Sequence, residues 1–423
     1  MRNARLLAFL LCLAPGMARA ESKFYLEDGD RVVFHGDSIT EQRLYSTYVE
    51  TYVVTRFPER NVTFVNSGWN FDRVTGGDRG GGPIDLRLRR DVFAHKPTVV
   101  TIMLGMNDAG YRPFDPKAFQ AFAKGYEHIV EAVKSELPDI RLTLIRPSPF
   151  DDVTRKPNVP GGGYNAVLVR YGAFIKELAE KSGVDVADLN TLVVAALEKA
   201  AEVDPTNARK LIPDRIHPGP GGALLLAGVL LKTWNAPATV TRVELEIGRD
   251  GVKTSRQENT KVTLATARKG GVVSWMQDDA ALPFPVELND PAVALAAKVS
   301  DFLLALDQEV LKVAGLDRPE YTLAIDDEEV GMFTKAQLAE GVNLAGLDTP
   351  MARQAAKVHT LTIKHHDVHH VRWRQVEVPW QDEKAPHLNA ALKGLDALEA
   401  DVVAEQRATA QPVPHRYELR PKS

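Results

Sequence analysis

The pattern of apolar runs between Arg31 and about Trp234 restricts the fold of this chain more than any other feature. Short apolar runs alternate there with longer amphipathic stretches. Residues 99–104 are apolar at nearly every position and are followed by Gly105, which is typical of a strand buried on both faces of a parallel sheet. Similar runs lie at 32–34, 62–65, 142–144 and 184–186, and helical patterns lie at 115–137, 164–181 and 221–234. Strands that alternate with helices predict a doubly wound α/β domain.

The pattern changes after Pro237. Val243, Leu245 and Ile247 alternate with charged residues, which predicts a half-exposed strand. Further strand patterns follow, then an apolar stripe at 299–310 that predicts a helix, and helical patterns that begin at Thr349 and at 387. A chain of 423 residues is long enough for two or three domains of ~100–200 residues. We therefore predict an α/β domain over residues 21–236 and a C-terminal mixed β and α accessory region over residues 237–423.

The first twenty residues are typical of a secretory signal peptide. Arg2 and Arg5 precede an apolar run at 6–14, and an Ala-x-Ala cleavage site ends at Ala20. The run is too short to span a bilayer, and no later segment has the pattern of a membrane span. We therefore expect a signal peptide over residues 1–20 and a protein that is secreted or periplasmic, without membrane insertion after cleavage.

Charge and cysteine content exclude several classes of function. Removal of residues 1–20 would take away three arginines and no acid, so the formal net charge would change from −4 to −7. A net negative charge does not favour the binding of a polyanion, so nucleic-acid binding is not expected. Cleavage would also remove Cys12, the only cysteine, which excludes thiol nucleophiles, cysteine-based zinc sites and iron–sulfur clusters. The oligomeric state stays open.

Four short polar blocks stand out, and three of them directly follow predicted strands. In open α/β sheets, sites collect at the carboxyl ends of the strands. Each block alone is a common turn or helix-cap signal, but their joint occurrence favours a functional site. The blocks are Gly36-Asp37-Ser38-Ile39-Thr40, Asn66-Ser67-Gly68, Gly105-Met106-Asn107-Asp108 and Asp214-Arg215-Ile216-His217-Pro218.

The residue types in these blocks suit the hydrolysis of acyl esters. A serine hydroxyl such as that of Ser38 needs a base, and a histidine held by a carboxylate can supply one. Asp214 lies three residues before His217, so one loop can present both. The tetrahedral intermediate needs donors aimed at its oxyanion. The candidates are the backbone N–H groups of Ser38 and Gly68 and the side-chain amide of Asn107.

As a set, the four blocks resemble the signature of the SGNH hydrolases, the superfamily of GDSL-type esterases, over about residues 23–234. The resemblance implies a flavodoxin-like three-layer α/β/α domain with Ser38 as nucleophile, His217 as general base and acid, and Asp214 as its orienting partner. It also implies an oxyanion hole of Ser38, Gly68 and Asn107, with no metal or other cofactor. The accessory region lies outside the minimal family domain, so the resemblance implies no role for it.

The superfamily acts on acetylated sugars, lipids, acyl thioesters and aryl esters. We favour a carbohydrate O-acetyl ester because the protein is expected to be exported and no long apolar stretch suggests an acyl-chain tunnel. Polar, glycine-rich insertions at 75–83 and 151–164 would also flank the site. Trp69, Arg73 and Tyr164 are the candidate substrate contacts, and the expected partner is an acylated small molecule or polysaccharide.

Two alternatives stay open. The first is a lipid esterase or acyl thioesterase, which would prefer long acyl chains. The second is a non-catalytic glycan-binding protein on the same fold, which would bind without turnover.

Two further groups of charged residues are interpreted as structural. We expect Arg87, Arg89 and Arg90 to face solvent on a helix. On a predicted helix, histidines four residues apart share a face and can bind a transition metal, but contacts where the accessory region docks are the favoured interpretation. A third possibility is that one of these histidines reaches the substrate cleft. The histidines concerned are His365, His366, His369 and His370, and Arg372, Trp373 and Arg374 follow them.

Overall fold

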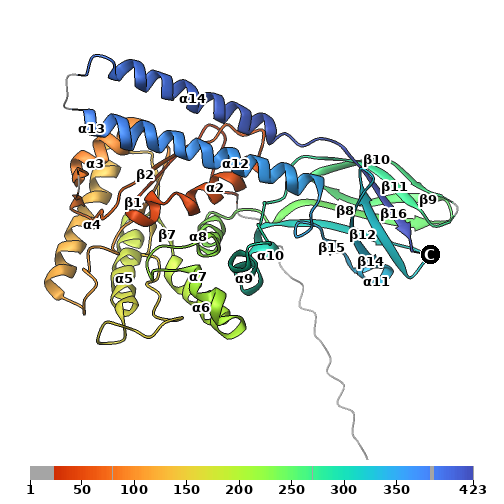
Figure 1. The fold of residues 1–423 in the computed structure, drawn as a ribbon, viewed down its shortest axis with the longest axis horizontal. Coiled ribbons are helices and arrows are strands. Elements are labelled where there is room, and N and C mark those ends of the chain that lie inside the picture. The colour runs from red at the N-terminus through yellow and green to blue at the C-terminus, as the bar shows by residue number, and fades with distance from the viewer. Residues whose placement is uncertain (1–22, 79, 269, 382–384, 423) are drawn as a thin grey trace, which may run out of the picture.

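The structure is a computed structural model, and it describes residues 23–422 apart from residues 79, 269 and 382–384. An α/β region and a β-rich region lie at opposite ends of the molecule, and two long C-terminal helices run along one side of it (Figure 1). The predicted signal peptide lies outside the described residues. The predicted fold class, an α/β domain with a C-terminal mixed β and α region, is confirmed.

The central sheet of the α/β region has the strand order β2-β1-β5-β6-β7, and every neighbouring pair is parallel. This is the flavodoxin-like order that the resemblance implied. The order reverses between β1 and β5, and ligands bind in the crevice that opens at the carboxyl ends of such strands. The strands are β1 (Arg31–Gly36), β2 (Thr63–Gly68), β5 (Val99–Met103), β6 (Arg141–Ile145) and β7 (Asp185–Ala187).

Helices cover both faces of this sheet. The helices α2 (Leu44–Arg56) and α8 (Pro220–Thr233) pack together, as do α4 (Pro116–Glu136) and α5 (Tyr164–Ser182). Because parallel crossovers are right-handed, the two pairs lie on opposite faces. The remaining elements of this region are α1 (Ser38–Glu41), α3 (Ile84–Asp91), η1 (Phe93–His95), α6 (Leu189–Val203), α7 (Pro205–Leu211) and the two-residue strands β3 (Gly76–Gly77) and β4 (Gly82–Pro83).

The ends of the long helices follow from their local sequence. Asp115 caps α4 by accepting a hydrogen bond from the backbone N–H of Lys117, and Gly183 ends α5 in the left-handed conformation. Nearly every residue of α8 is apolar and buried, as expected for a helix enclosed by its neighbours. The helices predicted at 115–137, 164–181 and 221–234 are confirmed to within two residues at each end.

The β-rich region contains two sheets around a second apolar core. One sheet has the order β10-β11-β16-β13-β14 and is antiparallel throughout, and the other has the order β15-β12-β8-β9. The strands are β8 (Thr239–Gly248), β9 (Gly251–Glu258), β10 (Thr260–Ala267), β11 (Val273–Asp279), β12 (Gln308–Ala314), β13 (Glu320–Ile325), β14 (Glu328–Thr334), β15 (Val342–Asn343) and β16 (His415–Pro421), with the short helix α11 (Lys335–Glu340) between β14 and β15.

The helix predicted over 299–310 is wrong. The segment instead contains the end of α9 (Pro291–Val299), the short α10 (Phe302–Leu306) and the start of β12. Ser300 is extended and ends α9, while Val310 pairs with Arg242 of β8 in a parallel ladder. Both helices join the apolar core of the α/β region. Arg56 reinforces this junction by donating to the carbonyls of Pro237, Thr239 and Leu306.

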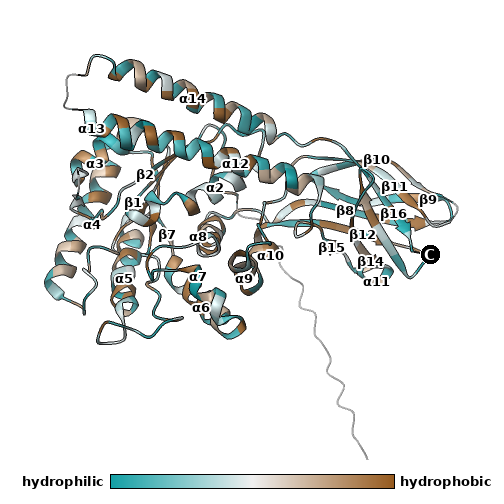
Figure 2. Ribbon diagram, in the orientation of Figure 1, coloured by the Kyte–Doolittle hydropathy of each residue, from teal (hydrophilic) through white to brown (hydrophobic). Residues whose placement is uncertain are grey.

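The C-terminal helices lie against the α/β region. The helix α12 (Pro350–His370) packs on α2 and continues into a π-helical turn, η2 (Val371–Glu377), and α13 (Val378–Trp380). The helix α14 (Leu388–Thr409) then packs on α12 (Figure 1). Figure 2 shows hydrophilic and hydrophobic residues intermixed along α14, in which only Gln406 is buried. Among the described residues, no helix is both long and apolar enough to cross a membrane.

Candidate active site

Ser38, His217 and Asp214 form a chain of hydrogen bonds at the edge of the central sheet. The Ser38 Oγ lies 2.8 Å from the His217 Nε2, and the His217 Nδ1 lies 2.6 Å from the Asp214 Oδ2. Ser38 follows β1, whereas the other two residues lie in the loop between α7 and α8. The structure therefore brings together three side chains whose positions span 179 residues of sequence.

The direction of proton transfer in this chain follows from its carboxylate. Burial alone would raise the pKa of Asp214, but hydrogen bonds from the His217 ring and backbone outweigh burial and lower that pKa. An ionised carboxylate only accepts, so the His217 Nδ1–H donates to Asp214 and leaves the Nε2 lone pair facing Ser38. The hydroxyl of Ser38 then donates to Nε2. This arrangement can remove a proton from the serine as its oxygen attacks an electrophile.

The turn after β1 fixes the position of Ser38. Asp37 caps the one-turn helix α1 by accepting a hydrogen bond from the Ile39 N–H at 3.0 Å. Ser38 is the first residue of α1, where intrahelical bonding leaves the backbone N–H unpaired. A side chain at Gly36 would place a Cβ 2.3 Å from the Thr40 Oγ1, so only glycine allows this close packing.

The loop that carries His217 is held by contacts that the sequence did not reveal. The Asp214 Oδ1 accepts from the backbone N–H groups of Ile216 and His217. Arg215 has a φ of +77° and donates to the carbonyls of Asp151 and Lys156. The glycine-rich insertion at 151–164 therefore supports the loop of the candidate triad.

The predicted oxyanion donor Gly68 is already engaged. Its N–H donates to the Asn66 Oδ1 at 3.1 Å, so it could serve an oxyanion only by sharing this hydrogen. Asn66 in turn donates to the carbonyl of Thr40 and to the Ser46 Oγ, which ties the second block to the first. A Cβ at Gly68 would lie 2.1 Å from the Glu41 backbone nitrogen, so the two blocks are in direct contact here.

Asn107 is held at both ends of its amide. The Nδ2 group donates to the carbonyl of Asp72 at 3.0 Å, and the Oδ1 accepts from the hydroxyl of Tyr111 at 2.9 Å. A primary amide carries two donor hydrogens, so one remains for a ligand. Sequence reasoning missed Tyr111, which stacks on Tyr164 and has a strained φ of +55°. An aromatic residue four positions after an asparagine gives no sequence signal for this contact.

Buried carboxyl groups surround the candidate oxyanion donors. Burial raises the pKa of Asp37 to about 8 and that of Asp108 to about 7. Burial also raises the pKa of Asp72 to about 6, against the opposing effect of Arg87. Near neutral pH, Asp37 is therefore mainly protonated, which removes a negative charge that would oppose an oxyanion beside Ser38.

Two of the three predicted substrate contacts require correction. Trp69 and Tyr164 both have 0% exposed surface, so neither offers a face to a ligand in this structure. The Trp69 Nε1 donates to the carbonyl of Asp78, and the Tyr164 hydroxyl donates to the carbonyl of Met106. The Arg73 side chain remains partly exposed and lies near the site, where its Nε donates to the carbonyl of Asn107 at 3.4 Å.

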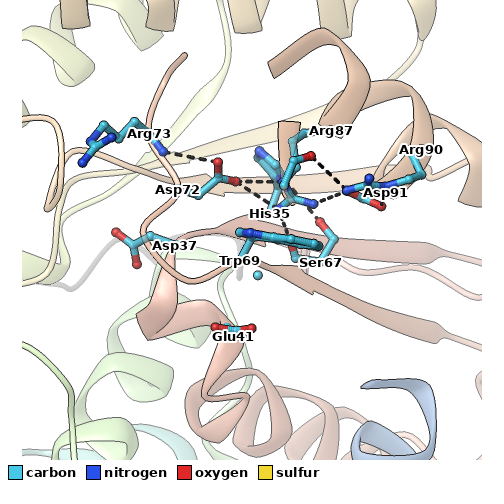
Figure 3. Close-up of polar contacts among 12 residues, drawn as sticks. His35, Asp37, Glu41, Ser67, Trp69, Asp72, Arg73, Arg87, Arg90 and Asp91 are labelled. Atoms are coloured by element: carbon cyan, nitrogen blue, oxygen red, sulfur yellow. Dashed lines mark hydrogen bonds and ion pairs between the residues drawn. The ribbon is translucent and has the colours of Figure 1, made fainter. Parts of the chain in front are cut away.

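The expectation that Arg87 faces solvent is also wrong. Arg87 is fully buried and donates to the Asp72 Oδ2, the Asp91 Oδ2 and the carbonyl of Ser67. Figure 3 shows this network on one side of the Trp69 ring and Glu41 on the other. An arginine on a helix can be exposed to solvent or buried in an ion pair. Only the three-dimensional placement of Asp72 and Asp91 shows that Arg87 is buried.

The histidine cluster lies between α12 and α2. In the described part of the chain, Glu50, His365 and His366 are the one group whose ligand atoms lie within 4.8 Å of one another. Each His donates to a different oxygen of Glu50 at 2.9 Å, and Gln406 donates to Glu50 as well. These contacts form a buried ion-pair network at the docking surface of α12, in line with the interpretation favoured from the sequence.

The chain is similar in sequence or in structure to several known proteins. Residues 34–225 match the model of the GDSL-like Lipase/Acylhydrolase family. Acetylxylan esterase of Geobacillus stearothermophilus is 25% identical over an alignment of 228 residues, and the match covers 48% of this chain and 93% of that protein. The solved structure of a gut microbial diltiazem-metabolizing enzyme is 24% identical, with a TM-score of 0.82 over 96% of this chain and 100% of that one. The solved acetyl xylan esterase AlAXEase is 22% identical, with a TM-score of 0.39 over 48% and 98% of the two chains. The diltiazem-metabolizing enzyme therefore shares the fold of the accessory region as well.

Proposed function

Since residues 34–225 form a domain of the GDSL-like lipase/acylhydrolase family, within the SGNH hydrolase superfamily, we propose that this protein is a serine esterase that acts through Ser38, His217 and Asp214. The family hydrolyses acyl esters. The observation that carries the serine mechanism is the hydrogen-bond chain from the Ser38 Oγ through His217 to Asp214. We further propose that the substrate is an O-acetylated carbohydrate.

Each residue has a defined step in the proposed reaction. The Ser38 oxygen attacks the ester carbonyl carbon while its proton passes to the His217 Nε2, and Asp214 stabilises the imidazolium. The Ser38 N–H and the free hydrogen of the Asn107 amide donate to the oxyanion. The intermediate collapses to an acyl-Ser38, and the leaving alkoxide takes the proton from His217. Water, deprotonated by the same Nε2, then releases the carboxylic acid and restores the serine.

The carbohydrate proposal has two supports. Acetylxylan esterase matches the chain over nearly the full length of that enzyme. The exposed part of Arg73 and the hydroxyl of Tyr111 also give the surroundings of Ser38 a polar character. Short acetyl groups need no long apolar channel, whereas a lipid esterase requires one.

We propose that the protein is exported. The support is the sequence of residues 1–20, with its arginines, its apolar run and its Ala-x-Ala site. Expression of the full chain followed by N-terminal sequencing tests this proposal. A mature protein that begins at Glu21 in the exported fraction is expected, and an uncleaved chain that stays inside the cell would contradict it.

The central experiment measures hydrolysis of acyl esters of graded chain length and of acetylated xylo-oligosaccharides. Wild type, Ser38→Ala and a matched control, Ser255→Ala, are compared, because Ser255 is exposed on β9. We expect activity that declines with acyl length, that is lost in Ser38→Ala and that is retained in the control. An optimum at long acyl chains would favour the lipid esterase or thioesterase, and binding of the oligosaccharide without turnover would favour the non-catalytic glycan-binding protein.

A further inference from the structure

The segment η2 of the accessory region contacts the residues that directly follow the first two polar blocks, Glu41 and Trp69. Arg374 places its guanidinium carbon 3.5 Å from the centre of the Trp69 ring, and its Nε lies 3.4 Å from the Glu41 Oε1. Glu41 is the last residue of α1, the helix that begins at Ser38, and Trp69 directly follows Gly68. The Arg374 side chain thus touches the residue that follows the first block and the residue that follows the second.

Trp373 contacts the same part of the molecule from the neighbouring position. Its ring meets the Trp69 ring edge-on at 5.7 Å, and its Nε1 donates to the Asp91 Oδ1 at 2.7 Å. Asp91 pairs with Arg87, which also donates to Asp72 and to the carbonyl of Ser67 in the second block. The carbonyl of Asp72 accepts the amide of Asn107. A continuous set of buried contacts therefore connects Trp373 with the candidate oxyanion donor Asn107.

The helix α1 needs such support because of its length. A helix of four residues has too few internal hydrogen bonds to be stable alone. The accessory region holds its far end twice, through Arg374 to the Glu41 side chain and through Arg43, which donates to the Glu41 carbonyl and to Asp367 of α12. Movement of α1 would displace the Ser38 oxygen and its N–H together, since both belong to its first residue.

We propose that Arg374 and Trp373 are positioning residues, and that the accessory region thereby fixes the geometry of the nucleophile and the oxyanion donors. This inference rests on the proposed serine esterase function. Arg374 acts through Trp69 and Glu41, and Trp373 acts through Trp69 and Asp91, and neither is assigned a contact with the reacting atoms. The role of the accessory region is then to complete the active site of the α/β domain.

The test compares the steady-state kinetics of Arg374→Ala and Arg372→Ala on 4-nitrophenyl acetate. Arg372 is the matched control, because it belongs to the same turn but pairs with Asp396 and Glu377. Displaced donors stabilise the transition state less while ground-state binding changes little. For Arg374→Ala we therefore expect kcat to fall on the order of tenfold, below the ~10²–10³ loss seen when an oxyanion donor is deleted outright. KM should stay close to that of wild type, and Arg372→Ala should keep the wild-type kcat.

Two further, more conservative variants test the inference even if Arg374→Ala fails to fold. Arg374→Lys retains the charge for Glu41 but not the planar group that stacks on Trp69, so its kcat should lie between those of wild type and Arg374→Ala. Trp373→Phe keeps the aromatic ring but removes the donor to Asp91, and it should also lower kcat. Thermal unfolding of each variant identifies any loss that arises from misfolding.

The outcomes separate this inference from the proposed function. A folded Arg374→Ala with wild-type kcat would overturn the inference, as would equal losses in Arg374→Ala and Arg372→Ala. A Ser38→Ala protein that still hydrolyses the ester would overturn the proposed function itself. An inactive Ser38→Ala together with a selective kcat loss in Arg374→Ala supports both.

Discussion

Asn107 illustrates how single side chains around Ser38 are fixed before any substrate binds. Both ends of its amide are hydrogen-bonded, to the Asp72 carbonyl and to the Tyr111 hydroxyl. A donor held in place needs no reorganisation when charge develops on the substrate. The orientation of this amide is therefore part of the proposed catalytic geometry.

Replacing Asn107 by Ala removes this donor. We expect kcat to fall by ~10²–10³, which corresponds to about 2.7–4 kcal/mol of transition-state stabilisation, with little change in KM. Steady-state kinetics on an acetyl ester measures the effect. A kcat equal to that of wild type would mean that Asn107 makes no contact with the oxyanion.

Tyr111→Phe tests the other end of the amide. The variant keeps the ring that stacks on Tyr164 but loses the hydroxyl that donates to Asn107. We expect a smaller loss of kcat than in Asn107→Ala, because the donor is loosened and not removed. Tyr48→Phe, in which the changed ring stacks on His359 of α12, serves as the control. In a double variant, the effects of Asn107→Ala and Tyr111→Phe should not add, and full additivity would contradict the coupling.

The raised pKa of Asp37 predicts that the stability and the kcat of the protein depend on pH. Burial raises its pKa from the ordinary value of 3.8 to about 8, so the carboxyl is neutral in the folded protein at pH 7 and ionises above pH 8. The stability that the neutral form contributes is present at low pH and is lost as pH rises from about 4 to about 8.

The charge that Asp37 gains beside Ser38 on ionisation would also oppose the oxyanion, so kcat should fall above pH 8. Asp37→Asn keeps the acceptor for the Ile39 N–H, and it should remove this alkaline decline. An unchanged decline in Asp37→Asn would exclude Asp37 as its source.

At the scale of elements, the contact between α1 and the end of β2 determines which residue position 68 can hold. A Cβ there would lie 2.1 Å from the Glu41 nitrogen and 2.5 Å from the Thr40 carbonyl carbon, which are backbone atoms that cannot move independently. Gly68 thus serves close packing in addition to any role as a donor.

Gly68→Ala should therefore displace α1 and lower both the thermal stability and kcat. Gly394→Ala in α14 is the control, because its Cβ would meet nothing within 4 Å. In a helix, this control should stabilise by roughly 0.5–1 kcal/mol. Measurement of Tm and kcat for both variants checks the prediction. An active, fully stable Gly68→Ala would show that α1 adjusts without cost.

The elements differ in how well the sequence predicts them. The helix at 115–137 could be predicted because its cap and its apolar period are local. The apolar stripe at 299–310 could not, since a buried strand and a short helix share that spacing and only pairing with β8 decides between them. The four polar blocks could be predicted because each lies within a few residues of sequence. The roles of three other residues could not be predicted. The partners of Arg215 and Arg374 lie far away in the chain, and Tyr111 and Arg215 lie in strained turns with a positive φ.

At the scale of the whole molecule, the accessory region docks through a buried network of charged and polar groups. Glu50 of α2 faces His365, His366 and Gln406, and Glu399 of α14 faces His365 and His369. Burial alone would lower the pKa of His365, but the carboxylates of Glu50 and Glu399 raise it to about 10. The sequence showed the histidines but not these acids, which lie about 315 residues before and 34 residues after His365.

This network makes stability depend on pH. The pKa of His365 is raised above its unfolded value of 6.5, so its contribution is fully present below pH 6.5 and is lost as pH rises toward about 10. We expect the Tm of wild type to fall between pH 7 and pH 10 more steeply than that of His365→Gln. Calorimetry at several pH values provides the measurement. Parallel pH profiles of the two proteins would show that His365 does not carry this charge.

The measurement that tests the central claim most directly is mass spectrometry of the protein after reaction with a fluorophosphonate, which labels activated serines. The proposed chemistry predicts one phosphonyl group per chain, attached to Ser38, and a much slower reaction in His217→Ala. Hydrolysis of acetyl esters by a protein whose Ser38 stays unmodified, or an equally fast reaction without the imidazole, would contradict the account.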